Sequence, residues 1–526
     1  MSTPVTHQSG RLSEGDLAPA PEPQEWRRQA IGLIAGVLLA LLVYLIFPAG
    51  AADTVANSSG ADPETTYEAG AMRVVAAVTV LMAVWWMTEA IPLAATALLP
   101  IAIFPLAGVA KFSDVSSPYA SSTIFLFMGG FLMALGLQRW NLHRRLALVV
   151  VSLVGTSPKR IILGFMIATG FMSMWVSNTA TAVVMLPIGV SVLTLTAESV
   201  GGMQNQKKFA TALMLAIAYS ASIGSLGTLI GTPPNALLAG YMKQAHDITI
   251  GFGQWMLVGM PVAVVFTFIA WFVLITVFKP EVDQISGGRE LIRDEIRQLG
   301  PWTFPQVAVG TIFLIAALSW ILIPLGIDYF GWGFPYDDAV VGIIAGLLMF
   351  IVPAKKDGTR ILDWKTANEL PWDVLLLFGG GLSLSSMFTK TGLSLWIGEA
   401  AKGLAVLPTF LLILAVAALV LGLTELTSNT ATAATFLPIM GGVAVGIGLT
   451  GATEMNVLLL AIPVALSATC AFMLPVATPP NAIAYSSGYV TMGEMLKGGV
   501  WLNAIALVLI SLATYFIAVP VFGMVL

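Results

Sequence analysis

Four short polar motifs stand in otherwise apolar stretches of the chain. Ser-Asn-Thr occurs at residues 177–179 and 428–430, and Thr-Pro-Pro-Asn occurs at residues 232–235 and 478–481. Proline lacks the amide hydrogen that a helix interior needs, so each Thr-Pro-Pro-Asn predicts a broken helix. A break exposes N–H groups that favour an anion, and it frees carbonyl oxygens that suit a small hard cation. The expected chemistry is joint binding of an anion and a cation.

The four motifs contain no basic side chain that could balance the charge of such an anion. No Lys or Arg lies within any of the four motifs, so helix ends, hydroxyl and amide donors and bound cations must balance it. Two Ser-Asn-Thr motifs favour a solute with two carboxylates, one held at each motif. The alternative is that these residues are ordinary helix caps and turn residues. Duplication of the motifs in one order argues against that alternative.

The duplication extends beyond the motifs. IFLFMGGFLMAL from Ile124 resembles VLLLFGGGLSLS from Val374, SNTATAVVMLPI from Ser177 resembles SNTATAATFLPI from Ser428, and each copy then reaches its Thr-Pro-Pro-Asn. An odd number of expected membrane crossings separates the copies, which predicts opposite orientations. Inverted repeats with interrupted helices are typical of secondary transporters, which bind substrate and coupling ions at the repeat interface.

The composition predicts that the elements holding these motifs are membrane helices. Of 526 residues, 57% are hydrophobic and 10% are charged, whereas soluble domains carry about 25% charged residues. The net charge of −4 and the short basic runs exclude a nucleic-acid partner. The single cysteine, Cys470, excludes an internal disulfide framework and a cysteine-based metal cluster.

We predict an all-α integral membrane protein with about eleven crossings, because a crossing needs roughly 20 apolar residues. Two further apolar stretches, residues 160–197 and 405–448, are interrupted by Ser-Asn-Thr and predict re-entrant helical hairpins. The expected crossings are residues 29–48, 71–92, 93–110, 122–138, 209–245, 254–278, 305–325, 338–353, 371–389, 455–490 and 498–525.

Loop charges predict the orientation, because basic loops stay inside the cell. Loops 139–160, 279–300 and 355–365 are basic, whereas loops 50–70 and 326–338 carry acidic residues and no basic ones. We therefore expect a multi-pass protein of the cell membrane, in bacteria the inner membrane, with a cytoplasmic N-terminus and an external C-terminus. The polar, proline-rich residues 1–28 are interpreted as a disordered cytoplasmic tail.

From the first crossing to the end, the paired motifs resemble the divalent anion/sodium symporter family. The resemblance implies sodium-coupled import of four-carbon dicarboxylates such as succinate, malate and fumarate. It also implies a homodimer in which a transport domain slides as an elevator against a scaffold. Alternatives are a sodium-independent dicarboxylate exchanger and a sulfate or citrate transporter. The implied segments are scaffold helices 29–138 and 305–389, interfacial helix, hairpin and discontinuous helix of the transport domain at 139–278 and again at 390–526, and a cytoplasmic linker 279–304.

The resemblance also implies binding residues, which are named here by position. One sodium ion would be bound by Ser173, Ser177, Asn178 and Gly231, and a second by Thr424, Thr427, Asn429 and Ala477. The implied substrate contacts are Ser177, Asn178, Thr179, Thr232, Ser428, Asn429, Thr430, Thr478 and Pro479. Ser173 and Thr424 lie one helical turn before their Ser-Asn-Thr serines, which also places them toward the same site.

Other functions fit the sequence less well. An intramembrane enzyme would need a nucleophile with its base or a metal pair, and the chain has no HExxH or GxSxG motif and only three histidines. A passive channel would need a continuous pore rather than two returning hairpins. Glu425 is expected to hold the second hairpin turn by hydrogen bonding, with an ion or proton role as the alternative.

Overall fold

The computed structural model describes residues 23–58, 65–154, 157–281, 288–333 and 335–526. These residues form helices, and their β pairing is an isolated bridge between Pro353 and Arg360. The predicted all-α class is therefore confirmed for the described part of the chain. The α-helices are α1 Pro23–Ile46, α2 Ala51–Ala56, α3 Ala69–Thr88, α4 Leu93–Thr96, α5 Leu99–Leu106, α6 Phe112–Ser116, α7 Ser122–Arg139, α8 Leu142–Val154, α9 Pro158–Ser173, α10 Asn178–Val200, α11 Lys207–Ser225, α12 Pro233–His246, α13 Phe252–Val277, α14 Gly288–Gln298, α15 Phe304–Phe330, α16 Asp338–Ile351, α17 Trp364–Ala367, α18 Trp372–Thr391, α19 Leu393–Ala400, α20 Thr409–Thr424, α21 Asn429–Gly446, α22 Leu458–Thr469, α23 Pro479–Ser486, α24 Met492–Ala513 and α25 Val519–Phe522.

Length and hydropathy make the protein a multi-pass membrane protein. Nine helical segments among the described residues are long and apolar enough to cross a bilayer. Helices α1 and α15 leave most of their side chains at least partly exposed, as lipid-facing helices do, whereas α11 is buried along nearly its whole length. Helix α11 therefore lies at the centre of the protein.

Several predicted boundaries were wrong. Helix α1 begins at Pro23, so residues 23–28 are helical and the predicted tail is shorter than 1–28; residues 1–22 lie outside the described part. The predicted crossing 93–110 is divided into the short helices α4 and α5, and α16 covers only Asp338–Ile351 of the predicted crossing 338–353. Short turns and prolines within these apolar runs end the helices early.

The predicted interruptions are confirmed. Helices α9 and α10 are joined by a turn at residues 174–177, and α20 and α21 by a turn at residues 425–428. Each Thr-Pro-Pro-Asn begins a new helix, α12 or α23, after a non-helical segment. Proline is tolerated at the first helical positions because the N–H that it lacks has no partner there.

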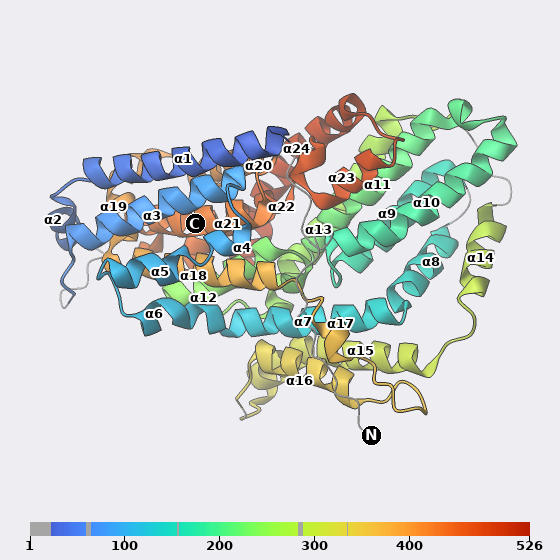
Figure 1. The fold of residues 1–526 in the computed structure, drawn as a ribbon, viewed down its shortest axis with the longest axis horizontal. Helices are drawn as coiled ribbons and strands as arrows, with labels where there is room; N and C mark the ends of the chain where they lie inside the picture. The colour runs from blue at the N-terminus through green and yellow to red at the C-terminus, as the bar shows by residue number, and fades with distance from the viewer. Residues whose placement is uncertain (1–22, 59–64, 155–156, 282–287, 334) are drawn as a thin grey trace, which may run out of the picture.

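The two repeats interlock in the fold. Helix α7 of the first repeat packs along α16, which precedes the second repeat, and α18 contacts α3 and α4 from the N-terminal part. Figure 1 shows α1 beside α3 at one end of the long axis, and α9, α10 and α11 gathered toward the other end. Consequently each end of the molecule contains segments that are far apart in the sequence.

Corresponding glycines bring one helix of each repeat against its broken segment. A Cβ atom added at Gly259 of α13 would lie 2.3 Å from the carbonyl oxygen of Leu226, and one added at Gly499 of α24 would lie 2.3 Å from that of Phe472. Any larger residue at these positions would push the helix away from the break. The repeats therefore share this backbone contact as well as their motifs.

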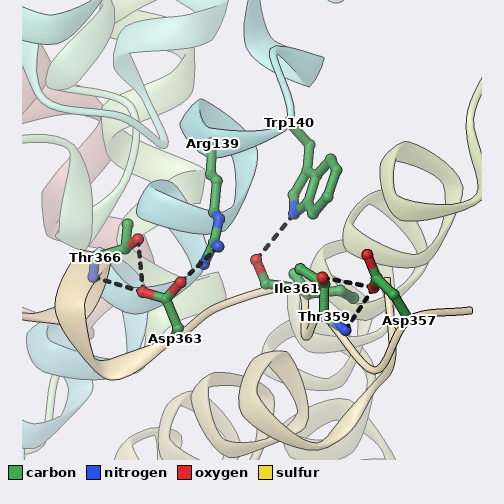
Figure 2. Close-up of polar contacts among 7 residues, drawn as sticks. All are labelled: Arg139, Trp140, Asp357, Thr359, Ile361, Asp363 and Thr366. Carbon is green, nitrogen blue, oxygen red and sulfur yellow. Dashed lines mark hydrogen bonds and ion pairs between the residues drawn. The ribbon is translucent and has the colours of Figure 1, made fainter. Parts of the chain in front are cut away.

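The end of α7 is tied to the loop between α16 and α18 by polar contacts (Figure 2). Arg139 pairs with Asp363 at 2.5 Å, and the Trp140 indole Nε1 donates to the carbonyl oxygen of Ile361 at 2.9 Å. Asp363 also accepts from the backbone N–H of Thr366 at 2.8 Å. Asn141, the residue after Trp140, has φ +53°, and the chain turns there into α8. The junction of α7 and α8 is thus held to the second half of the chain.

Candidate functional site

Three oxygen atoms converge where α9, α10 and α11 meet. The Ser173 hydroxyl, fully buried at the end of α9, donates to Asn178 Oδ1 at 2.6 Å and lies 2.5 Å from the carbonyl oxygen of Ala221. The Asn178 amide nitrogen donates to the Ser225 hydroxyl at 3.3 Å. Hydroxyl, amide and carbonyl oxygens are ligands that suit a small hard cation. We call Ser173, Asn178 and Ala221 the first oxygen cluster.

The second repeat forms the same arrangement. The Thr424 hydroxyl, fully buried at the end of α20, lies 2.8 Å from Asn429 Oδ1 and 2.7 Å from the carbonyl oxygen of Ala468. Thr424, Asn429 and Ala468 form the second oxygen cluster. Both clusters hold one hydroxyl, one side-chain amide oxygen and one main-chain carbonyl oxygen. Such repetition favours a shared role in binding over coincidental turn geometry.

Three other predicted sodium ligands, Gly231, Thr427 and Ala477, are buried. Gly231 is buried, and a Cβ atom added there would lie 2.3 Å from the carbonyl oxygen of Ser225. Ala477, its counterpart, is also buried. The Thr427 hydroxyl bonds to the carbonyl oxygen of Leu423 at 2.9 Å and to the Thr432 hydroxyl at 2.6 Å. Thr427 therefore belongs to the hairpin turn, where its hydroxyl already has local partners.

The predicted substrate contacts differ in their accessibility. In the first repeat, Ser177 and Thr179 are exposed at the start of α10; in the second, Ser428 and Thr430 are half-buried at the start of α21. Thr232 and Thr478 are buried, and Pro479 is exposed. Ser177 caps α10 by accepting from the backbone N–H of Ala180 at 3.3 Å, which gives this residue a structural role at the start of the helix.

Two residues of the motifs have a role that the sequence reasoning missed. The Asn235 amide nitrogen donates to carbonyl oxygens of the first break, including that of Thr228 at 2.9 Å. The Asn481 amide nitrogen donates to the carbonyl oxygens of Ala471 and Leu474, both at 3.1 Å. These asparagines hold the non-helical segments in shape. Their place as the last residue of each Thr-Pro-Pro-Asn was the signal that could have identified them.

The two broken segments lie next to each other. The hydroxyls of Thr232 and Thr469, which belong to different repeats, are 3.4 Å apart. The helix that follows each Ser-Asn-Thr packs against the helix that follows the Thr-Pro-Pro-Asn of the other repeat: α10 contacts α23, and α21 contacts α12. The N-terminal ends of these helices carry partial positive charge, which favours an anion. The arrangement thus places oxygen atoms that suit a cation close to helix ends that favour an anion.

A cavity of about 670 Å³ lies among α7, α12, α13, α15 and α16, and Leu229 of the first break also lines it. Its walls are mainly apolar and include Asp337, Asp338 and Lys243, and Lys243 pairs with Asp247 at 2.6 Å. Two aspartates repel a dianion. Despite its size, this cavity is a poorer anion site than the broken segments, and none of the four motifs contributes to its lining.

Comparison with known proteins identifies the family. The family model described as "Sodium:sulfate symporter transmembrane region" matches residues 63–523. The chain belongs to this family. The family membership predicted from the motifs is therefore confirmed.

Curated relatives of this sodium:sulfate symporter family member cover nearly the whole chain. A protein of Staphylococcus saprophyticus named sodium-dependent dicarboxylate transporter SdcS is 40% identical, over 94% of this chain and 92% of its own length. Its namesake in Staphylococcus aureus strain MRSA252 is 42% identical over the same shares. These relatives are transporters, in agreement with the expectation that the chain is not an enzyme.

Two solved structures resemble the fold of this family member. The Alcanivorax borkumensis YdaH transporter matches with a TM-score of 0.52 and 14% identity, over 92% of this chain and 98% of that one. Neisseria gonorrhoeae MtrF matches with a TM-score of 0.51 and 12% identity, over 89% and 98%. At these identities the likeness extends to the fold alone, which is a membrane transporter fold.

Proposed function

We propose that the chain is a sodium-coupled symporter that imports four-carbon dicarboxylates such as succinate, malate or fumarate across the cell membrane. The observation that supports this most strongly is the pair of oxygen clusters at adjacent breaks. Relatives named sodium-dependent dicarboxylate transporters add support for the ion and for the class of anion. Sodium is here a transported co-substrate rather than a resident cofactor.

In this proposal each oxygen cluster holds one sodium ion. Ser173 and Asn178 bind the first, with Ser177 and Gly231 at the edge of the site, and Thr424 and Asn429 bind the second, with Thr427 and Ala477 at the edge. The broken segments present main-chain carbonyl oxygens that intact helices would hide. Sodium occupancy lowers the repulsion that a dianion would otherwise meet from these oxygens.

The dicarboxylate then bridges the two repeats. One carboxylate is received at the start of α10 by Ser177, Asn178 and Thr179, and the other at the start of α21 by Ser428, Asn429 and Thr430. Thr232, Thr478 and Pro479 complete the contacts from the other two motifs. Since the four motifs contain no Lys or Arg, the anion depends on helix ends and sodium for its counter-charge. Transport of the anion is thereby coupled to sodium.

We further infer the moving parts and the assembly. Residues 29–138 and 305–389 form a scaffold, and residues 139–278 and 390–526 form a transport domain, joined by the linker 279–304, that slides as an elevator. The two hairpins are re-entrant, the N-terminus is cytoplasmic and the C-terminus is external. In a homodimer with contacts between the two scaffolds, the scaffolds would stay still while each transport domain moves.

Uptake by purified protein in liposomes tests the proposal. Labelled succinate should accumulate when an inward sodium gradient is imposed, and potassium or choline in place of sodium should abolish it. Equal uptake without sodium would instead support the sodium-independent exchanger. Competition by unlabelled four-, five- and six-carbon acids defines the preferred anion.

Sulfate is the second candidate, because the family description names it. Sulfate is compact, so it would need the two repeats to converge on a single group rather than on two separated carboxylates. Strong competition by sulfate together with weak competition by succinate would favour this candidate. Succinate competing well and sulfate poorly would exclude it.

A further inference from the structure

A buried carboxylate distinguishes the two otherwise similar breaks. Glu425, only 2% exposed, follows Thr424 at the second hairpin turn. Its Oε1 atom accepts from the backbone N–H of Phe472 at 2.7 Å, and its Oε2 atom accepts from that of Leu474 at 3.3 Å. The N–H of Met473 lies 3.1 Å and 3.2 Å from the two oxygens. Three consecutive N–H groups of the break thus converge on one side chain.

A fourth donor comes from another helix. The Asn503 amide nitrogen of α24 donates to Glu425 Oε1 at 2.6 Å. The sequence-based expectation that Glu425 holds its own turn is therefore incomplete, because Glu425 links the hairpin turn, the broken segment and α24. Hydrogen bonds to a charged acceptor are stronger than those between neutral groups. This link fixes the segment that leads to Ala477.

The first repeat makes the corresponding link without charge. Met174 precedes Ser177 by three residues, as Glu425 precedes Ser428. There the Thr228 hydroxyl donates to the carbonyl oxygen of Met174 at 2.5 Å. Asn503 lies four residues after Gly499, the glycine of α24 that contacts the break. The residue four positions after the corresponding Gly259 of α13 is Ala263, which is buried. The carboxylate and its amide donor therefore occur together in one repeat, and apolar residues replace both in the other.

The charge of Glu425 lies next to the second oxygen cluster and is not neutralised by a basic side chain of the described residues. Among the described residues, Glu425 is not part of any ion pair. Its hydrogen-bond donors are neutral N–H groups. A buried negative charge attracts a cation in its neighbourhood more strongly than it would in water. The second oxygen cluster begins at the adjacent residue, Thr424. The first oxygen cluster has no equivalent charge at Met174.

We propose that Glu425 is a positioning residue that makes the second oxygen cluster the tighter of the two sodium sites. It does so by fixing the broken segment at residues 472–474 and by adding negative charge beside Thr424. Asn503 assists by orienting the carboxylate. This inference rests on the proposed function, because it assigns unequal roles to the two sodium sites of that function.

The test compares the sodium dependence of succinate uptake in Glu425→Gln and the wild type, with choline keeping the ionic strength constant. Glutamine keeps the size of the side chain and removes its charge. We expect the half-saturating sodium concentration to rise at least about fivefold, the lower end of ordinary coupling between sites. The maximal rate at saturating sodium should stay within about twofold of the wild type. Glu425→Asp, which keeps the charge, should recover part of the sodium affinity.

Two matched variants separate the effect of the Glu425 charge from the effect of a hydrogen bond that only holds the break to the hairpin turn. Thr228→Val removes the neutral link of the first repeat and should change the half-saturating sodium concentration less than Glu425→Gln does. Glu369→Gln removes an exposed carboxylate and should behave as the wild type. An equal rise in Thr228→Val and Glu425→Gln, or a loss of maximal rate in Glu425→Gln with unchanged sodium dependence, would overturn the proposal.

Sodium binding is measured on the same purified proteins by the increase in melting temperature on replacing choline with sodium, because a ligand of the folded state raises stability. Sodium should stabilise the wild type more than Glu425→Gln. If uptake proves independent of sodium but this difference persists, the proposed coupling fails and the role of Glu425 stands. An equal increase in both proteins refutes the role of Glu425, even where uptake requires sodium. If Glu425→Gln does not fold, the same comparison is made with Asn503→Ala, for which a smaller loss in the same direction is expected.

Discussion

At the residue scale, the two asparagines at the starts of α10 and α21 connect both proposed ligands. Asn178 and Asn429 each present an amide oxygen to a cluster hydroxyl, at 2.6 Å and 2.8 Å. Each also lies in a Ser-Asn-Thr motif proposed to receive a carboxylate. A single side chain at each break is therefore placed to sense both sodium and substrate.

Asn178→Ala and Asn429→Ala should each reduce sodium-driven succinate uptake at least about tenfold, because each removes one proposed sodium ligand of a coupled site. Expression and size-exclusion behaviour should match the wild type. Asn368→Ala, at an exposed position, is the control. Uptake at the wild-type rate by both cluster variants would contradict the site assignment.

Gly231→Ala should also impair transport, for a steric reason. The new methyl group would lie 2.3 Å from the carbonyl oxygen of Ser225, so the break must shift. Overpacking of this kind costs about 1–3 kcal/mol, which a lower melting temperature of the purified protein would register. Gly451→Ala adds a methyl group where no atom lies within 4 Å and should melt as the wild type does. Equal melting temperatures for the two variants would refute the steric argument.

The sequence was sufficient for the identity of the motif residues but not for their bonding. Ser173 and Thr424 were implied by the family resemblance, with their one-turn spacing as support, and both bond to the motif asparagines. The carbonyl oxygens of Ala221 and Ala468 were missed, because any residue type supplies the same main-chain atom. Asn235, Asn481 and the donors to Glu425 were missed because loop folding brings them together.

At the element scale, the interrupted helices were predictable and the lengths of several others were not. Proline pairs after an apolar run mark a break with a clear physical cause, and both breaks are present. The short helices α4 and α5 were read as one crossing because hydropathy alone does not show where a helix ends. The link between α7 and the residue 353–366 loop, shown in Figure 2, depends on contacts between distant segments.

That link gives a pH prediction outside the membrane. The Thr366 backbone N–H, with smaller contributions from its hydroxyl and from Arg139, lowers the pKa of Asp363 below its ordinary value of 3.8. A carboxyl group with a lowered folded-state pKa stabilises the fold above its unfolded-state value, and this stability is lost as pH falls through the folded-state pKa. The melting temperature of the wild type should therefore exceed that of Asp363→Asn near neutral pH.

The same difference should shrink as the pH falls below about 4, where the wild-type carboxyl group becomes protonated. Both proteins are measured in detergent across this range, with the surface variant Asp294→Asn as the control. Because the ion pair with Arg139 is partly exposed, we expect an effect of no more than about 1 kcal/mol. A difference that does not change with pH would show that the Asp363 charge is irrelevant.

At the scale of the whole molecule, the elevator proposal requires α12 to move relative to α18. A Cβ atom added at Gly240 of α12 would lie 3.0 Å from a methyl group of Leu382 on α18, so the two helices are in close contact. A disulfide between Gly240→Cys and Leu382→Cys has room to form, since replacing leucine vacates the space that the new cysteine enters.

Oxidation of this double variant should reduce uptake at least about fivefold, and a reductant should restore it, because the cross-link holds the proposed scaffold and transport domain together. Each single cysteine variant, oxidised in the same way, controls for the substitutions. The natural Cys470 is buried and is present in all of these proteins. Full uptake by the cross-linked protein would mean that α12 and α18 belong to one moving body.

The exchange of partners between repeats, with α10 on α23 and α21 on α12, has an evolutionary consequence. A precursor of half the length would have possessed each helix but not a finished site, so two copies would have had to associate before either could carry a solute. Gene fusion then freed the halves to diverge. Only after that step could the two halves come to differ at this position, with Glu425 in one and Met174 in the other.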